Sequence, residues 1–349
     1  MNTEFLTQLL TAPGPSSDER IPARLWRAEA ASFADDVFVD VRGSSYAVLA
    51  GGAPRVMLAG HIDEIGLIVT HIDDDGFIWF SGVGGWDPQV LVGQRIELIG
   101  IGGPVIGVIG KRPIHLMKPD EREKAVKIDE LWIDIGASSR ADAAERVGVG
   151  TMGVIDARPQ QFPGGRIVGR SIDNRIGAYV VLEALRLLAA DRPAATVAAV
   201  ATTQEEITFA GAMTSAFSFE PQVAIAVDVT FATDHPAMDK RRHGEARLGG
   251  GPVISRGSVN SPVIFELLVA AAEREGISYS VDVAPASSGT DADAIHRTRG
   301  GVASGVISVP NRYMHSPNEM VQLSDVEQAA RLIAAFVRGL DAQTELRPL

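Results

Sequence analysis

The sequence predicts an α/β fold: a mixed central sheet covered by helices, with a β-rich domain inserted into it. Apolar runs alternate with helical patterns from about residue 165 onward, which indicates the α/β part, because buried strands read as continuous Val, Ile and Ala segments. The stretch 65–165 differs, since it is dense in glycine and in short Val/Ile segments. A length of 349 residues also favours about two domains. We therefore expect an α/β domain formed by 1–64 and 166–349, and an inserted domain formed by 65–165.

Four apolar runs in the expected α/β domain are typical of strands buried on both faces. These runs are 55–60, 194–201, 223–227 and 301–309. Shorter apolar segments in the expected insert predict a small β-barrel or sandwich. These segments are 76–80, 94–99 and 104–109.

Three stretches carry apolar residues at helical spacing and predict helices. They are 175–190, 261–275 and the chain from Ser324 to Leu340. In the last stretch, Ser324 and Glu327 form a capping-box pattern, which predicts Ser324 as the N-cap of the helix.

Composition and charge exclude several classes of function. No apolar run approaches the ~20 residues that a membrane-spanning helix needs. A net charge of −12 disfavours nucleic acid as a partner, because such proteins carry basic patches. The first residues lack a basic segment followed by an apolar stretch, so we expect a cytoplasmic protein without a signal peptide. The chain has no cysteine, which excludes disulfides, thiolate metal sites and cysteine nucleophiles.

Polar residues that can bind metals follow the predicted strands. In open α/β sheets, ligands bind beyond the carboxyl ends of the strands. The residues at or near these ends are His61, Asp63, Glu205, Glu206, Asp228 and His315. One further acidic residue, Asp173, lies just before the helix at 175–190. Each alone has a simpler explanation, such as a surface loop or, for Asp173, a helix N-cap. Together they predict a cation site, because clustered carboxylates repel each other unless a cation neutralises them.

Two divalent ions fit this inventory of side chains. Ions ~3.5–4 Å apart can activate a water and polarise a scissile carbonyl, with one bridging carboxylate and a separate carboxylate as general base. Asp63 is placed to orient the ring of His61. Ligands of the His, Asp and Glu types suit zinc, and cobalt or manganese bind the same groups.

Six motifs in order resemble the signatures of the tetrahedral (TET) aminopeptidases, a group that includes glutamyl and deblocking aminopeptidases and some members labelled endoglucanases. The resemblance covers about 55–340. The motifs are His61-Ile62-Asp63, Ser171-Ile172-Asp173-Asn174-Arg175-Ile176-Gly177, Thr203-Gln204-Glu205-Glu206, Val227-Asp228-Val229-Thr230, Ser288-Gly289-Thr290-Asp291-Ala292 and His315-Ser316-Pro317-Asn318-Glu319.

The resemblance implies a metal-dependent aminopeptidase that removes N-terminal residues from short peptides. It implies that Asp173 bridges two ions. One ion would have His61 and Asp228 as further ligands, and the other would have Glu206 and His315. Glu205 would be the general base. The resemblance also implies a zinc-exopeptidase-like sheet and a PDZ-like insert that drives dimerisation, with dimers that assemble into tetrahedral dodecamers. The remaining histidines match no ligand position; they are His71, His115, His235, His243 and His296.

The sequence departs from the family pattern after the paired glutamates. Thr208 stands where the family has glycine, and Ala210 stands where it has a basic residue. Asp293 replaces the final glycine of the Gly-Thr-Asp-Ala-Gly pattern. None of the three is an expected ligand. Because Thr208, Phe209 and Ala210 add no charge, they favour a neutral or apolar residue at the substrate's N-terminus.

Two other kinds of enzyme remain open from the sequence alone. A related di-zinc amidohydrolase, such as a carboxypeptidase or deacylase, needs a basic residue for the substrate carboxylate, and Arg170, Arg175 and Arg312 are the candidates. A glycosidase needs two carboxylates at a defined separation and no metal, and Glu205 with Asp173 or Asp228 would supply them. A glycosidase mechanism would give no role to His61 and His315.

Overall fold

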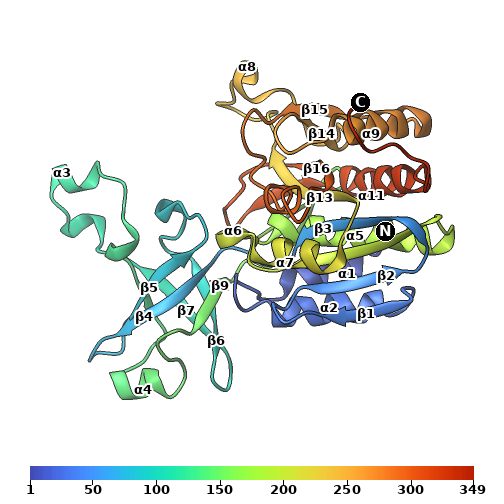
Figure 1. Ribbon diagram of the computed structural model, residues 1–349. Helices are drawn as coiled ribbons and strands as arrows, with labels where there is room; N and C mark the ends of the chain where they lie inside the picture. Colours follow the sequence, from blue (N-terminus) through green and yellow to red (C-terminus); the bar gives the residue numbers. More distant parts are fainter.

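The computed structural model describes residues 1–349 and shows a mixed α/β body with a β-barrel beside it (Figure 1). The body is built on an eight-stranded sheet that runs from β1 at one edge to β15 at the other. In spatial order, its strands are β1 (Asp36–Val39), β2 (Ser45–Leu49), β12 (Ala195–Thr202), β3 (Gly52–His61), β13 (Val223–Phe231), β16 (Ala303–Asn311), β14 (Val253–Arg256) and β15 (Ser280–Val283).

The four central strands of this sheet, β12, β3, β13 and β16, are parallel to one another. Their carboxyl ends therefore meet at one edge of the sheet, where His61 pairs with Thr202 and Asp228 pairs with Ser308. The outer pairings β1–β2, β2–β12 and β14–β16 are antiparallel, so the sheet is mixed as predicted. The four predicted apolar runs coincide with these four central strands.

Helices cover both faces of the sheet and bury two separate apolar clusters. The larger cluster lies under α1 (Thr3–Thr11), α2 (Arg20–Ala30), α5 (Ile172–Ala190), α9 (Pro262–Glu275) and α11 (Leu323–Arg338). The smaller cluster lies on the opposite face, under α7 (Ala210–Phe219) and α10 (Ala292–Ile295). Side chains of one strand alternate between the two clusters, as for Ala224 and Ile225 of β13, because neighbouring strand residues point to opposite faces. The short helices α6 (Glu205–Thr208) and α8 (Lys240–His243) lie near the strand ends.

The predicted helices are present, but the capping box at the start of the last one is wrong. Helix α11 begins at Leu323, and its N-cap is Gln322, which makes no side-chain capping bond. Ser324 therefore lies inside the first turn. The chain enters the helix directly from a paired strand, and the N–H of Leu323 bonds to the carbonyl of Gly165 instead.

The barrel between Gly66 and Ile155 has an apolar core of its own. Its strands, in the order of pairing around the barrel, are β4 (Gly66–Ile72), β5 (Ile78–Val83), β8 (Trp132–Asp134), β7 (Gly103–Gly110), β6 (Arg95–Gly100) and β9 (Met152–Ile155). Its short helices are η1 (Pro88–Val90), η2 (Ile114–Leu116), α3 (Pro119–Arg122), η3 (Ile128–Glu130) and α4 (Arg140–Ala144). The β-rich character expected of this stretch is confirmed as a closed barrel.

A third, three-stranded sheet follows the barrel. It consists of β10 (Gln160–Phe162), β11 (Arg166–Gly169) and β17 (Glu319–Gln322). Strand β17 brings Glu319 opposite Gly169, next to the start of α5. No helix anywhere in the chain combines the length and the apolar character needed to cross a membrane.

Candidate active site

The structure brings the seven predicted site residues together at the carboxyl edge of the central sheet. Six of them line one open pocket. They are His61, Asp173, Glu205, Glu206, Asp228 and His315. The seventh, Asp63, is fully buried beside them. Residues up to 254 positions apart in the chain (61 to 315) thus share one site, because the parallel strands end at the same edge.

Asp173 lies between the two histidines and offers one carboxylate oxygen to each. Its Oδ1 is 3.3 Å from Nε2 of His61, and its Oδ2 is 3.4 Å from Nε2 of His315. Two ligands bound to one zinc at ~2.0–2.1 Å with tetrahedral angles lie about 3.3 Å apart. Both separations therefore match those of ligands that share an ion, and the two oxygens of the carboxylate face two different ring nitrogens.

The remaining carboxylates surround the same two ring nitrogens. Glu205 Oε2 and Asp228 Oδ1 lie 3.6 and 3.9 Å from His61 Nε2, and Glu206 Oε2 lies 3.5 Å from His315 Nε2. Two groups have donor atoms that all lie within 4.8 Å of one another, which is close enough to hold an ion. These groups are His61 with Glu205 and Asp228, and His61 with Asp173 and Glu206.

The buried carboxylates of this cluster would be stabilised by a bound cation. Burial, followed by the charge of Asp173, raises the pKa of Glu206 to about 8. Burial also holds the pKa of Glu205 and that of Asp228 well above their usual range. Oε1 of Glu206 is buried and has no hydrogen-bond partner. A buried carboxylate oxygen without a donor is costly, and a divalent ion would satisfy it, so the residues present fit a metal.

Backbone carbonyls fix the tautomers of both histidines. Nδ1 of His315 lies 2.7 Å from the carbonyl oxygen of Gly85, which belongs to the barrel part of the chain. Nδ1 of His61 lies 3.2 Å from the carbonyl oxygen of Asp63 and 3.5 Å from its Oδ1, so the carbonyl, rather than the expected carboxylate, is the nearer acceptor. Since a carbonyl can only accept, each Nδ1 donates and each neutral ring presents an unprotonated Nε2 to the carboxylates.

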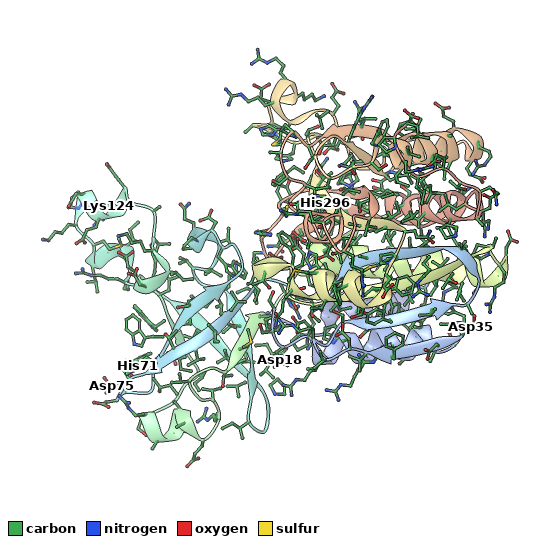
Figure 2. The ribbon with its side chains drawn as sticks, viewed as in Figure 1. Asp18, Asp35, His71, Asp75, Lys124 and His296 are labelled. Atoms are coloured by element: carbon green, nitrogen blue, oxygen red, sulfur yellow. The ribbon has the colours of Figure 1, made fainter.

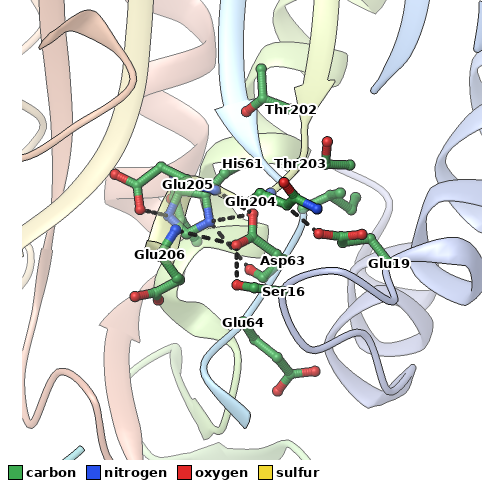
Figure 3. A network of polar contacts seen from close by, with 12 residues as sticks. Ser16, Glu19, His61, Asp63, Glu64, Thr202, Thr203, Gln204, Glu205 and Glu206 are labelled. Carbon is green, nitrogen blue, oxygen red and sulfur yellow. Dashed lines mark hydrogen bonds and ion pairs between the residues drawn. The ribbon is translucent and has the colours of Figure 1, made fainter. Parts of the chain in front are cut away.

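The carboxylate of Asp63 holds the backbone of the paired glutamates (Figure 3). Its Oδ1 accepts from the N–H of Glu205 and its Oδ2 from the N–H of Glu206, each at 3.2 Å. The hydroxyl of Ser16 donates to the same carboxylate. These contacts place the start of α6 relative to the end of β3, so both glutamates face the pocket.

The carboxylate of Glu319 holds the backbone of two other site residues, Asp173 and His315. The sequence alone did not single out Glu319. This residue is buried; its Oε2 accepts from the N–H of Asp173, and its Oε1 accepts from the N–H of His315, each at 3.0 Å. Asn311 Nδ2 donates to the same Oε1 at 3.3 Å. The only sequence signal was the position of Glu319 four residues after His315, at the end of the same family motif.

The backbone next to the site residues adopts left-handed conformations without glycine. Ser171, Gln204 and His315 have φ of 60°, 59° and 57°. Such conformations cost free energy and persist where surrounding contacts enforce them, as at functional sites. Asp173 is not an N-cap, because the next residue, Asn174, accepts from the N–H of Gly177 and caps the regular part of α5. The Asp173 side chain is thereby left free for the pocket.

All three arginines that were candidates for binding a substrate carboxylate are already paired with acidic residues. Arg170 and the fully buried Arg175 both bind Glu64, at 2.5 and 2.7 Å. Arg312 binds Asp234 at 2.7 Å. No lysine or arginine lines the large pocket, and Arg170, which lines a smaller adjoining pocket with Asp173, Glu206 and His315, is bound to Glu64.

The histidines outside the cluster lie elsewhere, as expected. Figure 2 shows His71 on the barrel and His296 in the body. Nδ1 of His296 lies 2.8 Å from the carbonyl oxygen of Ala292, one helical turn earlier, and His296 does not line the pocket. Asp293, which departs from the family pattern, accepts from the N–H groups of Ser288 and Gly289 and so stabilises the loop at the pocket wall.

Comparison with known proteins agrees with this architecture. Residues 43–332 match the M42 glutamyl aminopeptidase family. The lysyl aminopeptidase of Pyrococcus furiosus is 35% identical, over 97% of this chain and 97% of its own. A TET aminopeptidase from a marine sediment archaeon of the Thaumarchaeota has a TM-score of 0.94 at 34% identity, covering 98% of this chain and 97% of its own. The TET1 peptidase of Pyrococcus horikoshii, which can assemble into a tetrahedron or a large octahedral shell, has a TM-score of 0.86 at 32% identity, covering 97% and 99%.

The fold, the site and these relatives define a peptide hydrolase. The chain belongs to the M42 glutamyl aminopeptidase family.

Proposed function

We propose that this protein is an aminopeptidase that uses two divalent metal ions to release the N-terminal residue of short peptides. The observation that carries the proposal is the position of Asp173, whose two oxygens each face Nε2 of a different histidine. Asp173 would bridge the ions. His61 with Asp228 would complete one site, and Glu206 with His315 the other. Zinc suits this set of nitrogen and oxygen ligands best, and cobalt or manganese would bind the same groups.

The side chains have distinct tasks in hydrolysis. When bound, two divalent ions would lower the pKa of a water molecule and polarise the scissile carbonyl. Glu205 is the general base: it takes the proton of the attacking water and passes it to the leaving amine. Its backbone is held by Asp63, so the carboxylate points into the pocket and is free of hydrogen bonds to other side chains. Asp63 acts through this contact and through the carbonyl that orients His61.

The surroundings of the pocket favour an aminopeptidase over a carboxypeptidase. A carboxypeptidase must bind the free carboxylate of its substrate, and Arg170, Arg175 and Arg312 are all engaged with acidic partners. A free amine, in contrast, suits a pocket that is rich in carboxylates. A glycosidase would need no histidine, whereas both Nε2 atoms here face carboxylates.

The proposal includes the domain roles and the assembly expected from the sequence. We take 1–64 with 166–349 as the catalytic, zinc-exopeptidase-like domain, and 65–165 as a PDZ-like dimerisation domain. Exposed apolar side chains on the barrel support an interface there; they include Ile101, Ile106, Val108, Ile114 and Leu116. We propose homodimers that build a tetrahedral dodecamer in the cytoplasm. Light scattering would measure the mass of the assembly, and fractionation of the source cells would test the location.

A panel of aminoacyl p-nitroanilides tests the activity. We expect hydrolysis that a chelator abolishes and added zinc or cobalt restores, with no cleavage of an N-terminally blocked peptide or of a β-glucan. Chelator-resistant hydrolysis, or cleavage of the glucan alone, would contradict the proposal.

A further inference from the structure

The pocket extends from the proposed metal ligands along the sheet to its far edge. Asp228 lies on β13, and the strands that follow it across the sheet are β16, β14 and β15. Ser308 and Val306 of β16, Ser255 of β14 and Asp282 of β15 line the same pocket. Asp282 pairs in register with Ser255, so their side chains point to the same face of the sheet.

Asp282 is an acidic group in this pocket without a cationic partner. Its carboxylate accepts one hydrogen bond, from the N–H of the next residue, Val283, and forms no ion pair. The nearest cation along β14, Arg256, follows Ser255 and therefore points to the other face, where its guanidinium stacks on Phe265 at 5.1 Å. No lysine or arginine lines the pocket. The charge of Asp282 is therefore available to a ligand.

The charge balance of the pocket makes Asp282 the group that discriminates between substrates. Two divalent ions would offset the negative charges of the four carboxylates at the metal-binding end of the pocket. Asp282 would then be the residue in the pocket lining whose negative charge is not balanced by a positive one. It also lies far from that end, because three strand spacings of about 4.8 Å separate β13 from β15 by about 14 Å. Only a long side chain on the substrate's first residue would approach it.

We propose that Asp282 makes this pocket select peptides that begin with lysine or arginine. The inference rests on the proposed aminopeptidase function and names its substrate class. Lysine and arginine combine a long aliphatic stem with a terminal cation, which matches a pocket whose acidic group lies at the far end. An N-terminal glutamate would place its charge in a pocket without a basic side chain, which disfavours it.

This preference differs from the neutral one that Thr208, Phe209 and Ala210 indicate. Of these three residues, only Phe209 lines the pocket, whereas Thr208 borders a separate hollow between α7 and α10. Specificity is therefore set at β14 and β15 rather than at the residues after Glu206. An acidic side chain on the edge strand β15 can also serve to prevent pairing with other sheets. If Asp282 selects substrates, removing its charge should change the substrate preference. If it only protects the sheet edge, removing its charge should leave that preference unchanged.

The test compares lysine with norleucine, which has the same stem length and no charge. We expect kcat/KM for lysyl p-nitroanilide to exceed that for norleucyl p-nitroanilide at least tenfold, and that for glutamyl p-nitroanilide by more. Asp282→Asn should lower the lysine-to-norleucine ratio at least tenfold, whereas Asp282→Glu, which keeps the charge, should retain a ratio above one. Rising salt should also reduce the ratio in the wild type, because charge attraction is screened.

Binding supplies a readout that does not depend on turnover. Calorimetry should show that L-lysine binds the inactive Glu205→Gln variant more tightly than L-norleucine does, and that Asp282→Asn abolishes the difference. Glu266→Gln is a matched control, because it removes one negative charge from the exposed face of α9 and leaves the pocket intact. An active enzyme whose ratio is the same in Asp282→Asn and wild type would overturn the inference while leaving the proposed function intact. Absence of any aminopeptidase activity would instead contradict the proposed function itself.

Discussion

The carbonyl oxygen of Gly85 accepts a hydrogen bond of 2.7 Å from Nδ1 of His315, and the two residues belong to different parts of the molecule. Gly85 follows strand β5 of the barrel, whereas His315 follows strand β16 of the central sheet. The bond directs Nε2 of the ring toward Asp173 and Glu206. The inserted barrel therefore contributes to the site itself, because it fixes the orientation of a proposed metal ligand.

A side chain at position 85 should disturb this ligand. A Cβ on Gly85 would lie 3.3 Å from Nδ1 of His315, which is closer than side chains normally approach. We expect Gly85→Ala to turn the imidazole and to weaken metal binding about 10–100-fold, the usual effect of losing a partner of a ligand histidine. Competition with a fluorescent chelator would measure it. Gly102→Ala is the control, since a Cβ there meets nothing within 4 Å. Equal affinities in both variants would show that the Gly85 contact does not matter.

Glu319 should act on the metal site through the backbone. Its carboxylate accepts the N–H groups of Asp173 and His315. Glutamine has one acceptor oxygen and one donor NH₂ group, so Glu319→Gln would leave one of these N–H groups facing a donor. We expect weaker metal binding, by about 10–100-fold as for other partners of metal ligands, and activity that excess zinc partly restores. Glu130→Gln, on the exposed surface of the barrel, should change neither. Unaltered zinc affinity in Glu319→Gln would refute this role.

The paired glutamates should differ in their effects when neutralised. We expect Glu205→Gln to lower kcat by about 10²–10⁴-fold, as is typical for loss of a general base, with the metal content unchanged. Glu206→Gln should instead lose metal, because its carboxylate faces His315 as a proposed ligand. Elemental analysis of both variants, together with steady-state kinetics, would separate the two roles. Loss of metal from Glu205→Gln and not from Glu206→Gln would reverse the assignment.

The stability of the metal-free protein should fall as pH rises from about 5 to 9. Burial, followed by the charge of Asp63, raises the pKa of Glu19 to about 7, and burial raises that of Glu206 to about 8. The hydrogen bond to Asp173 raises the pKa of His315 to about 9. All three groups bind protons more tightly in the folded chain than in the unfolded one, where the values are 4.5, 4.5 and 6.5. Their contribution to stability is therefore complete at low pH and is lost as pH rises through the folded-state values.

Thermal unfolding after chelation would measure this dependence. We expect a decrease in Tm across the window of at least about 3 °C, which corresponds to roughly 1 kcal/mol for a large domain. The gain in Tm on adding zinc should grow with pH, because metal and protons compete for the same carboxylates and imidazoles. A metal-free Tm that is flat or rises between pH 5 and 9 would contradict the electrostatic account of the cluster.

Local patterns predicted the central strands and the residues at their ends, because a buried parallel strand is a continuous apolar run and its carboxyl end is marked by polar residues. The same patterns did not reveal Ser16, Gly85, Glu319 or Asp282. Ser16, Gly85 and Glu319 each contact a partner that is distant in the chain, as Gly85 contacts His315 across 230 positions, and Asp282 lies on a strand three places from that of Asp228. Ser324 shows a further limit, since the strand β17 continues to Gln322 and the N–H of Leu323 bonds to the carbonyl of Gly165, which overrides the capping signal.

Metal content per chain tests the central claim most directly. After equilibration with zinc and gel filtration, elemental analysis should give two ions per wild-type chain and one per chain in Asp228→Asn, which removes a ligand of one proposed site. Asp173→Ala should lose both ions, because its two oxygens face both histidines. One ion or none in the wild type, or two ions retained in Asp173→Ala, would contradict a two-metal centre bridged by Asp173.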